Sequence, residues 1–365
     1  MKVAQFLYSG LGGHGSVAFS LIEGDAELRW SNALGFIGVE PLLDDYRRRC
    51  EAAGIPYAYF PARRGRPWSA WPPVRDWLNS TEPDAIICHG GPALPPSALH
   101  ARRRGVPLIA VEHSSMAARR RAEMLYTRIA MHLADAVVVL TEELAGGLRA
   151  GLGRAYRTDK VSIIPTGINT DRFHPAKRTD DRPSSVRIGM AGRLTPVKRN
   201  DDLIAVAREL QRLRPEHGWT LSFAGDGEDR SRLEVMAREL APGVVEFAGM
   251  LDEQALADWY RSLDVYVHAS TAEALSTSIL QAMASELPIV ASDVPGVAAL
   301  LPADAGILLG NGDALAWAEE IASLVASEER MAALGRNARD LCVRQYSHRR
   351  MHEAYDELIR AHARR

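Results

Sequence analysis

Short runs of apolar residues recur along the whole chain, separated by longer segments that mix apolar and polar positions. The runs do not alternate with polar residues, which is typical of parallel strands that are buried on both faces. They cover residues 3–8, 34–39, 57–60, 85–88, 107–111, 136–140 and 160–165 in the first half, and 186–191, 219–224, 244–250, 265–269, 288–291 and 306–309 in the second.

Helical spacing of apolar residues fills many of the segments in between, notably 42–53, 141–150, 252–262, 276–285, 313–325 and the tail from 328 onward. This alternation of strands and helices predicts an α/β fold with parallel sheets that helices cover on both faces. Loops that lead from a strand into a helix gather at the carboxyl edge of such a sheet, and ligands bind there. The sequence therefore predicts a functional site in those loops.

The length of 365 residues favours two domains. The segment AKRTDDRPSS at 176–185 is polar and poor in apolar residues, so it is the expected linker. We expect an N-terminal domain over 1–178 and a C-terminal domain over 184–345.

Charge and cysteine content narrow the class of protein. A formal net charge of −2 argues against a general nucleic-acid binder. Three widely spaced cysteines, Cys50, Cys88 and Cys342, favour reduced thiols, and no CxxC or His/Cys cluster indicates a metal site. The apolar run at the N-terminus is short for a signal peptide, and no run approaches the roughly 18 apolar residues of a membrane span. We therefore expect a cytoplasmic protein whose membrane contact, if any, is peripheral.

Two arginine clusters bear on membrane contact, Arg102–Arg104 and Arg119–Arg121. A basic helix face can dock to acidic lipid headgroups at the inner face of a membrane, or bind an anionic acceptor. The alternative is a solvated face on a helix whose apolar side packs on the domain core.

The glycine-rich segment SGLGGHGS at 9–16 follows the first predicted strand. Gly10, Gly12 and Gly15 match GxGxxG, a pattern that lets the backbone approach a phosphate closely. A dinucleotide-binding domain also needs an acidic residue at the end of the second strand, and Glu40, which Pro41 follows, fits that position poorly. A tight turn that binds no ligand is a further alternative.

Histidines occur at the predicted carboxyl edge of the first sheet. His113 directly follows one strand, His89 follows the strand before it, and His14 lies in the glycine-rich segment. These positions make all three candidates for ligand contact, although a loop histidine can also be satisfied by hydrogen bonds to the backbone.

Residues 271–293, TAEALSTSILQAMASELPIVASD, join two predicted strands through a loop and a short helix. Glu273 lies in the loop, where its carboxylate can accept hydrogen bonds from hydroxyl groups. Ser276 is a good N-cap, and the free N–H groups and partial positive charge of a helix start suit a phosphate. The alternative is an ordinary buried helix with one loop carboxylate.

This stretch resembles the signature of the family 4 retaining glycosyltransferases, the glycosyl transferases of group 1. Their pattern has a Glu, seven residues, a second Glu, Ala-Met-Ala and then a strand that begins with Pro. Glu273 fits the first position, whereas Gln281 stands at the second and replaces a charged acceptor by an amide. Three further segments carry the likeness: TGINTDRFHP at 166–175, GRLTPVK at 192–198 and AGDG at 224–227.

The resemblance implies the GT-B architecture, in which two Rossmann-like, doubly wound parallel-sheet domains face each other across a cleft. It also implies that residues 346–365 form a helix that crosses back to the N-terminal domain. The implied activity is transfer of a hexosyl or N-acetylhexosaminyl group from a nucleotide sugar, UDP favoured over GDP. The acceptor would be a hydroxyl of a glycan or of a lipid-linked cell-envelope molecule, and no metal or other cofactor would be required.

The resemblance also supplies roles for site residues. Arg193 and Lys198 would hold the donor diphosphate, because a leaving nucleoside diphosphate gains negative charge as the glycosidic bond breaks. Glu273 would bind hydroxyls of the donor sugar, and His113 would contact that sugar near the reaction centre. Further donor contacts are expected from the diphosphate-facing Gly12 and Gly13, the base-facing Met250, the ribose-facing Gln281 and the loop residues Ala274, Leu275 and Ser276.

Three other functions stay open at this point. A sugar-nucleotide hydrolase or epimerase of the same architecture would act without an acceptor. An NAD-dependent oxidoreductase would use residues 10–15 but would leave Arg193 and Lys198 without a role. A binding module without activity is supported by Gln281, which departs from the family pattern.

Overall fold

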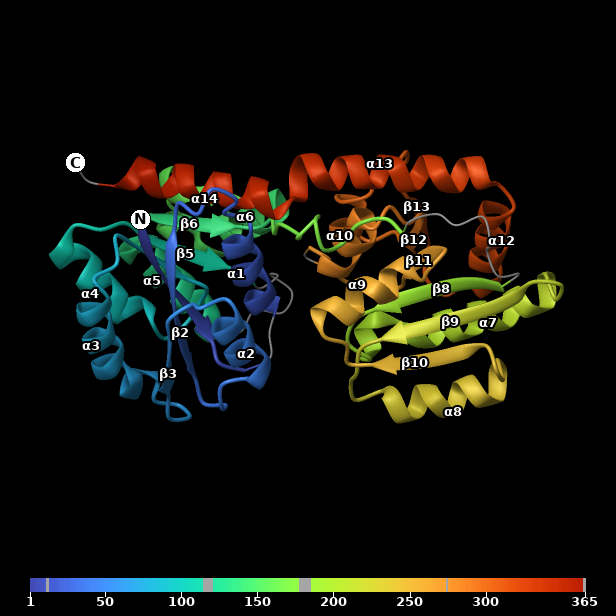
Figure 1. Ribbon diagram of the computed structural model, residues 1–365, viewed down its shortest axis with the longest axis horizontal. Helices are drawn as coiled ribbons and strands as arrows, with labels where there is room; N and C mark the ends of the chain where they lie inside the picture. The colour runs from blue at the N-terminus through green and yellow to red at the C-terminus, as the bar shows by residue number, and fades with distance from the viewer. Residues whose placement is uncertain (11–12, 114–120, 177–184, 274, 364–365) are drawn as a thin grey trace. The chain divides into compact units, whose positions relative to one another are not determined.

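The computed structural model describes residues 1–10, 13–113, 121–176, 185–273 and 275–363. The chain divides into two compact units. Figure 1 shows both, with the colour running by residue number from the N-terminus to the C-terminus. Unit 1 consists of Met1–Gly167 together with His348–Arg365, and unit 2 of Ile168–Ser347. Each unit is an α/β domain with its own sheet and its own hydrophobic cores.

In the described part of unit 1, seven parallel strands form one sheet in the order β3-β2-β1-β4-β5-β6-β7. The central strand β1 pairs with β2 from Lys2 opposite Ser31, and with β4 from Val3 opposite Ala85. The chain therefore winds outward from β1 in both directions. The strands are β1 (Lys2–Tyr8), β2 (Ser31–Gly38), β3 (Tyr57–Pro61), β4 (Ala85–Cys88), β5 (Leu108–Glu112), β6 (Ala136–Val139) and β7 (Val161–Ile163).

Helices cover both faces of the unit 1 sheet, and successive strand residues such as Val3 and Ala4 enter different cores. One face packs against α1 (Gly13–Glu23), α2 (Asp44–Ala52) and α14 (His348–His362), and the other against α3 (Trp71–Thr81), α4 (Leu94–Arg104) and α5 (Arg121–Leu133). The remaining helical elements are α6 (Glu142–Leu152) and the 3₁₀ turns η1 (Pro67–Ala70), η3 (Gly153–Ala155) and η4 (Thr158–Lys160).

The described part of unit 2 repeats this plan with six parallel strands in the order β10-β9-β8-β11-β12-β13. The central strand β8 pairs with β9 from Ser185 opposite Gly218, and with β11 from Val265 opposite Ile188. The strands are β8 (Ser185–Ala191), β9 (Gly218–Ala224), β10 (Val245–Gly249), β11 (Val265–His268), β12 (Ile289–Ser292) and β13 (Ile307–Leu309).

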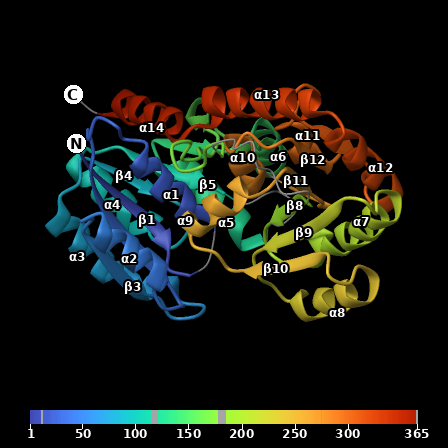
Figure 2. The same ribbon diagram turned by 45° about the vertical axis from the view of Figure 1, so that its right-hand side comes forward.

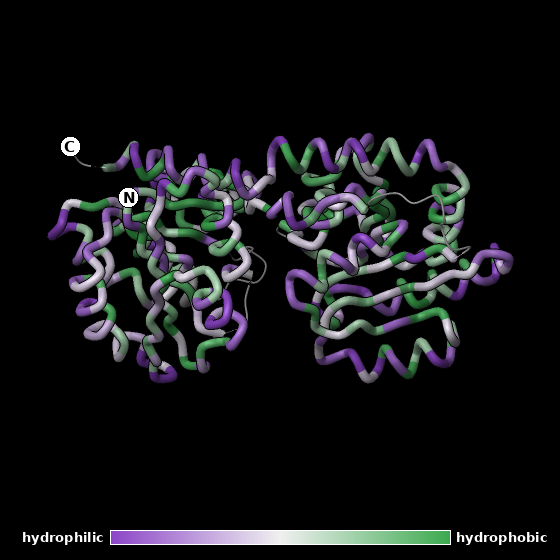
Figure 3. The backbone as a smooth tube through the Cα atoms, viewed as in Figure 1, coloured by the Kyte–Doolittle hydropathy of each residue, from purple (hydrophilic) through white to green (hydrophobic). Residues whose placement is uncertain are grey.

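Helices again cover both faces of the sheet in unit 2. One face packs against α7 (Asn200–Leu213), α8 (Arg230–Leu240) and α12 (Ala314–Val325), and the other against α9 (Glu253–Arg261), α10 (Thr277–Ala284) and α11 (Pro295–Ala298). Helix α13 (Glu328–Tyr346) contributes to both cores, with Met331 and Leu334 in the first and Ala338 and Cys342 in the second. Figure 3 colours the chain by hydropathy, and outer helices such as α13 alternate between hydrophilic and hydrophobic colours along their length. The fold class expected from the sequence is confirmed, because both sheets are parallel and doubly wound.

The chain terminus returns to unit 1. Helix α14 lies along the sheet of this unit in both views (Figures 1 and 2), and Met351, Tyr355 and Ile359 pack against strand residues such as Val3. The buried carboxylate of Asp356 accepts a 2.9 Å hydrogen bond from the Trp30 indole N–H. Unit 1 is therefore completed by the last segment of the chain.

Candidate active site

Each sheet has a point where the direction of winding reverses, between β1 and β4 in unit 1 and between β8 and β11 in unit 2. Doubly wound sheets bind ligands outside the carboxyl ends of the strands at such a point. In unit 2 these strand ends lead to Arg193 and Lys198 after β8, and to Glu273 after β11. In unit 1 the end of β4 leads directly to His89.

The loop after β8 is held close to the loop after β9. Gly225 has a φ of +135°, and a Cβ atom at this position would lie 2.0 Å from the carbonyl oxygen of Gly192. Leu194 is buried, and its N–H donates to the carbonyl of Asp226 at 3.0 Å. Arg193 remains exposed, and its guanidinium makes no hydrogen bond or ion pair to any residue that the structure describes. An unpaired guanidinium in this place can bind two oxygens of an anion at once.

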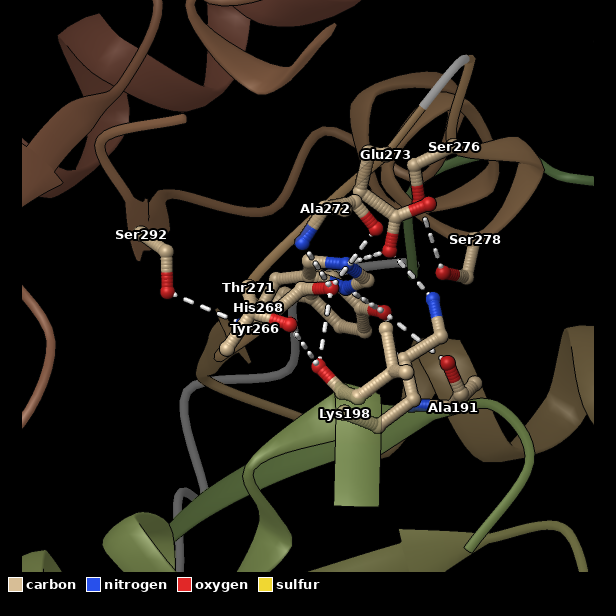
Figure 4. Close-up of polar contacts among 12 residues, drawn as sticks. Ala191, Lys198, Tyr266, His268, Thr271, Ala272, Glu273, Ser276, Ser278 and Ser292 are labelled. Atoms are coloured by element: carbon tan, nitrogen blue, oxygen red, sulfur yellow. Dashed lines mark hydrogen bonds and ion pairs between the residues drawn. The ribbon is translucent and has the colours of Figure 1, made fainter. Parts of the chain in front are cut away.

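Lys198 and Glu273 form an ion pair at the carboxyl edge of the unit 2 sheet (Figure 4). Lys198 ends the 3₁₀ turn η5 (Pro196–Lys198), and its Nζ contacts Oε1 of Glu273. The same Oε1 lies 2.8 Å from Nε2 of His268, the last residue of β11, whose side chain is fully buried. The side chains of Lys198 and Glu273 are 16% and 11% exposed, so solvent screens their attraction weakly.

The protonation states in this cluster follow from burial and charge. Burial alone raises the pKa of the Glu273 carboxyl, but the hydrogen bond from His268 and the charge of Lys198 outweigh it and lower the pKa to about 2. Burial lowers the pKa of His268, although its hydrogen bond to Glu273 acts in the opposite direction. At neutral pH the site therefore holds a carboxylate beside a neutral imidazole.

The loop that carries Glu273 is bonded to the turn that carries Lys198. The N–H of Thr271 donates to the carbonyl of Val197 at 2.9 Å, and the hydroxyl of Ser270 donates to the same oxygen at 3.2 Å. Both side chains of the ion pair thus project from backbone segments that are fixed to one another, which favours a preformed binding site.

Helix α10 begins in this loop, and its start differs from the expected one. Ser276 occupies the N-cap position, but its side chain accepts no capping hydrogen bond. Its buried hydroxyl lies 3.1 Å from the hydroxyl of Ser278 instead, which takes it away from the backbone N–H groups. Ser276 is therefore the N-cap residue, as expected, but it makes no capping hydrogen bond. No side chain in the described part of the chain caps the first N–H groups of α10, and such groups can bind an anion.

The other expected donor contacts of unit 2 are distributed around this helix. The hydroxyl of Tyr260 lies 3.2 Å from Oε1 of Gln281 on α10, and the Gln281 amide is partly buried. Leu275 packs against the core of unit 2, and Met250, which follows β10, is 64% exposed. Gln281 is thus tied to a buried tyrosine, whereas Met250 is free to contact a ligand.

Some of the expected residues fall outside the described part of the chain, namely Gly12, Ala274, Arg119 and Arg120. Gly13 is the first residue of α1. Of the other arginine cluster, Arg102 and Arg103 are exposed in the last turn of α4, and Arg104 pairs with Glu82.

Histidines gather at the corresponding edge of unit 1. Nδ1 of the buried His89 lies 3.1 Å from Nε2 of His113, and Nε2 of His89 lies 3.0 Å from Oε1 of Gln5. The ring of His14 is 6.2 Å from that of His113 between centroids. Burial lowers the pKa of His89 and lowers that of His113 to about 3, and the nearby His14 adds to both shifts. These rings are neutral at pH 7 and can exchange hydrogen bonds with hydroxyl groups.

The structure brings Lys198 and Glu273 into direct contact, places Arg193 in the loop that leads to Lys198, and places His113 in unit 1. Sequence reasoning missed His268, whose partner Tyr266 is also buried in β11. A signal was present, because a histidine within an apolar strand must find a hydrogen-bond partner once buried. Within the described ranges, no group of three or more His, Cys, Asp or Glu side chains is placed to hold a metal ion.

Two family models match most of the chain. The model described as "Glycosyltransferase Family 4" matches residues 12–172, and the one described as "Glycosyl transferases group 1" matches residues 185–327. The chain belongs to this family of glycosyltransferases, and its two doubly wound parallel-sheet domains are those of the GT-B architecture. No helix in the described part of the chain has the length and apolar character needed to cross a membrane.

Relatives by sequence match about half of the chain. The "D-inositol 3-phosphate glycosyltransferase 2" of Catenulispora acidiphila is 30% identical over 222 residues, which cover 56% of this chain and 51% of that protein. The "GDP-mannose-dependent alpha-mannosyltransferase" of Mycobacterium tuberculosis is 28% identical over 233 residues, 58% of this chain and 56% of that protein. The chain thus spans about half the length of the curated relatives it matches.

Solved structures match over nearly the full length. HepE of Anabaena, crystallised with UDP, has a TM-score of 0.80 at 18% identity and covers 99% of this chain and 100% of its own. Sucrose-phosphate synthase of Thermosynechococcus elongatus has a TM-score of 0.77 at 19% identity, covering 99% of this chain and 98% of its own. These likenesses establish the fold.

Proposed function

We propose that the protein is a retaining glycosyltransferase that moves a sugar from a nucleoside-diphosphate sugar to a hydroxyl of a glycan or lipid-linked acceptor. The observation that carries this proposal is the cluster of Lys198, Glu273 and His268 at the reversal point of the unit 2 sheet, next to the uncapped start of α10. A cation and free helix N–H groups suit a diphosphate, and a carboxylate suits the hydroxyls of a sugar. The diphosphate and the sugar are the two parts of a nucleotide-sugar donor between which the glycosidic bond breaks.

In this proposal the C1–O bond to the diphosphate breaks and a C1–O bond to the acceptor hydroxyl forms. Arg193, Lys198 and the first N–H groups of α10 stabilise the charge that the leaving diphosphate gains. Glu273 accepts hydrogen bonds from hydroxyls of the donor sugar, and His113 also contacts that sugar. A phosphate oxygen of the leaving group takes the proton from the acceptor hydroxyl, so atoms and charge balance.

The base of the donor separates two versions of this proposal. We favour a UDP-sugar, and the support is that HepE, which shares the fold over 99% of the chain, is crystallised with UDP-glucose. GDP-mannose is the alternative, because a relative that is 28% identical over 233 residues carries that donor in its name. Exposed Met250 is the expected contact to the base in either case.

A screen of nucleotide sugars for release of free nucleoside diphosphate tests the proposed function. We expect release with UDP-sugars, a larger rate when a glycan or lipid-linked hydroxyl acceptor is present, and retention of the anomeric configuration in the product. Release at the same rate with water alone would indicate a hydrolase, and isomerised sugar nucleotide an epimerase. Binding of nucleotides in calorimetry without any turnover would indicate that the protein is a binding module without activity.

A further inference from the structure

Among the described residues, Lys198 and His268 both contact Glu273 through the same carboxylate oxygen. Nζ of Lys198 and Nε2 of His268 contact Oε1, and the latter distance is 2.8 Å. Oε2 has no hydrogen-bond partner among the residues that the structure describes. The carboxylate is thus held by one oxygen and keeps the lone pairs of the other for a ligand.

The carboxylate also fixes the direction of the hydrogen bonds behind it (Figure 4). A carboxylate accepts hydrogen bonds but does not donate them, so Nε2 of the neutral His268 must carry the proton and Nδ1 must be an acceptor. The hydroxyl of Tyr266 lies 3.3 Å from Nδ1 and also 3.3 Å from the carbonyl oxygen of Ala191, so two acceptors face its one proton. Burial raises the pKa of Tyr266, which keeps this hydroxyl protonated, and the N–H of Ala191 donates to it at 3.4 Å.

Lys198 and His268 differ in how they respond to an anionic ligand. Lys198 carries a charge on a flexible stem, so a diphosphate competes with Glu273 for its ammonium. His268 is fully buried, rigid and bonded on both ring nitrogens, and a neutral ring gains little from a phosphate. His268 is therefore the contact of Glu273 that persists when Lys198 binds a diphosphate.

We propose that His268 is a positioning residue for the donor sugar: its Nε2–H holds Oε1 of Glu273, so that Oε2 stays available to a sugar hydroxyl while Lys198 binds the diphosphate. This proposal rests on the proposed function of the site. Tyr266 and the backbone of Ala191 extend the arrangement on the far side of the ring, where the Tyr266 hydroxyl lies 3.3 Å from Nδ1.

Two conservative variants of His268 provide the sharpest test. A glutamine amide nitrogen reaches roughly the place of Nε2, whereas an asparagine amide reaches roughly the place of Nδ1, and both side chains are polar. Losing a hydrogen bond to a charged group lowers kcat/KM on the order of tenfold or more. With UDP-glucose and GDP-mannose as probes, we expect that loss in His268→Asn, and kcat/KM within about threefold of wild type in His268→Gln. Equal activity of the two variants would overturn the proposal.

Binding of UDP and GDP alone supplies the control for a purely structural effect. Because Glu273 is assigned to the sugar, calorimetry should give the same affinity for the nucleoside diphosphate in wild type and in both variants. A parallel loss of nucleoside-diphosphate affinity and of turnover in both variants would show that His268 supports the fold of the site, and the positioning role would be rejected.

A measurement on the wild-type protein separates this proposal from the proposed function. Long-range ¹H–¹⁵N correlation spectra distinguish the imidazole tautomers, and His268→Gln assigns the signal. We expect a neutral ring protonated at Nε2 before and after addition of the nucleotide sugar. A ring protonated at Nδ1, or at both nitrogens, would refute the role of His268 even in an active enzyme. If no nucleotide sugar is turned over or bound by the wild type, the proposed function fails instead.

Discussion

Arg193 and Lys198 are two cations on one loop whose surroundings differ. Lys198 is paired with Glu273 in the structure, so an incoming anion has to compete for its charge. Arg193 is exposed and has no ion-pair partner among the described residues, so it can bind an anion without breaking a contact. This division suits a site that first attracts a diphosphate and then stabilises it as a leaving group.

We expect Arg193→Ala and Lys198→Ala each to lower kcat by roughly 100-fold, as the loss of one group that stabilises the transition-state charge does. Steady-state release of nucleoside diphosphate from the donor that the wild type accepts measures this effect. The matched control is Arg238→Ala, because Arg238 is exposed in the last turn of α8, at the opposite edge of the sheet from the site. Turnover close to wild type in both site variants would show that neither Arg193 nor Lys198 stabilises the transition-state charge.

His89 and His113 show how burial controls charge at the edge of unit 1. Burial lowers the pKa of His113 from the usual 6.5 to about 3 and lowers that of His89 as well. The unfolded chain therefore binds more protons than the folded one between about pH 6.5 and about pH 3. The free energy of unfolding that these neutral rings contribute is fully present above about pH 6.5, and it is lost as the pH falls toward about 3.

We expect the double variant His89→Gln/His113→Gln to lose less free energy of unfolding than wild type when the pH falls from about 7.5 to about 5.5. Urea unfolding at the two pH values measures the difference for each protein. His174→Gln, which replaces an exposed histidine of unit 2, is the control for loss of an imidazole. An unchanged pH dependence in the double variant would mean that these rings are already protonated in the folded protein at about pH 5.5.

At the scale of elements, the parallel strands could be predicted because each is a continuous apolar run buried on both faces, as β4 and β6 show. Helix α4 was not predicted, because Pro95 and Pro96 in its first turn and arginines in its last turn hide the apolar spacing. The N-cap position of Ser276 could be predicted, but its hydrogen bond could not, because Ser278 competes for the hydroxyl. The preference of serine for the N-cap position does not show which neighbouring group its hydroxyl will bond to.

The close approach of two strand-end loops is an element-scale property that depends on Gly225. Its φ of +135° disfavours any side chain, and a Cβ atom would collide with the backbone of the Arg193 loop at Gly192. We expect Gly225→Ala to cost clearly more free energy of unfolding than the roughly 1–3 kcal/mol of backbone strain alone, and to lower turnover by moving Arg193. Urea unfolding and steady-state kinetics measure the two effects.

Gly243 provides the control for strain without collision. It also has a positive φ, +76°, but nothing lies within 4 Å of a Cβ atom placed there. We expect Gly243→Ala to show the strain cost and to leave turnover unchanged. Equal stability losses in the two variants, with turnover intact in both, would mean that the loops can separate without consequence for the site.

At the scale of the whole molecule, the chain builds unit 1 from both of its ends. Unit 1 contains Met1–Gly167 and regains His348–Arg365 after the chain has formed unit 2. The tail shows helical spacing in the sequence, but the spacing does not reveal which sheet its apolar side covers. That information lies in long-range contacts such as the bond between Asp356 and Trp30, which are 326 positions apart.

Asp356→Ala tests this dependence on the chain terminus. Asp356 is buried on α14, and its loss leaves the Trp30 indole N–H, 2.9 Å away, without its acceptor, which costs about 1–3 kcal/mol. The two units have separate hydrophobic cores, so the cost should fall on unit 1.

Hydrogen-exchange mass spectrometry should show faster exchange in β1, β2 and α14 and unchanged exchange in β8 and β11. Glu357→Ala, which replaces an exposed neighbour on the same helix, should leave both units as in wild type. Faster exchange spread evenly over both sheets would show that the chain unfolds as a single cooperative body, with α14 supporting the whole of it.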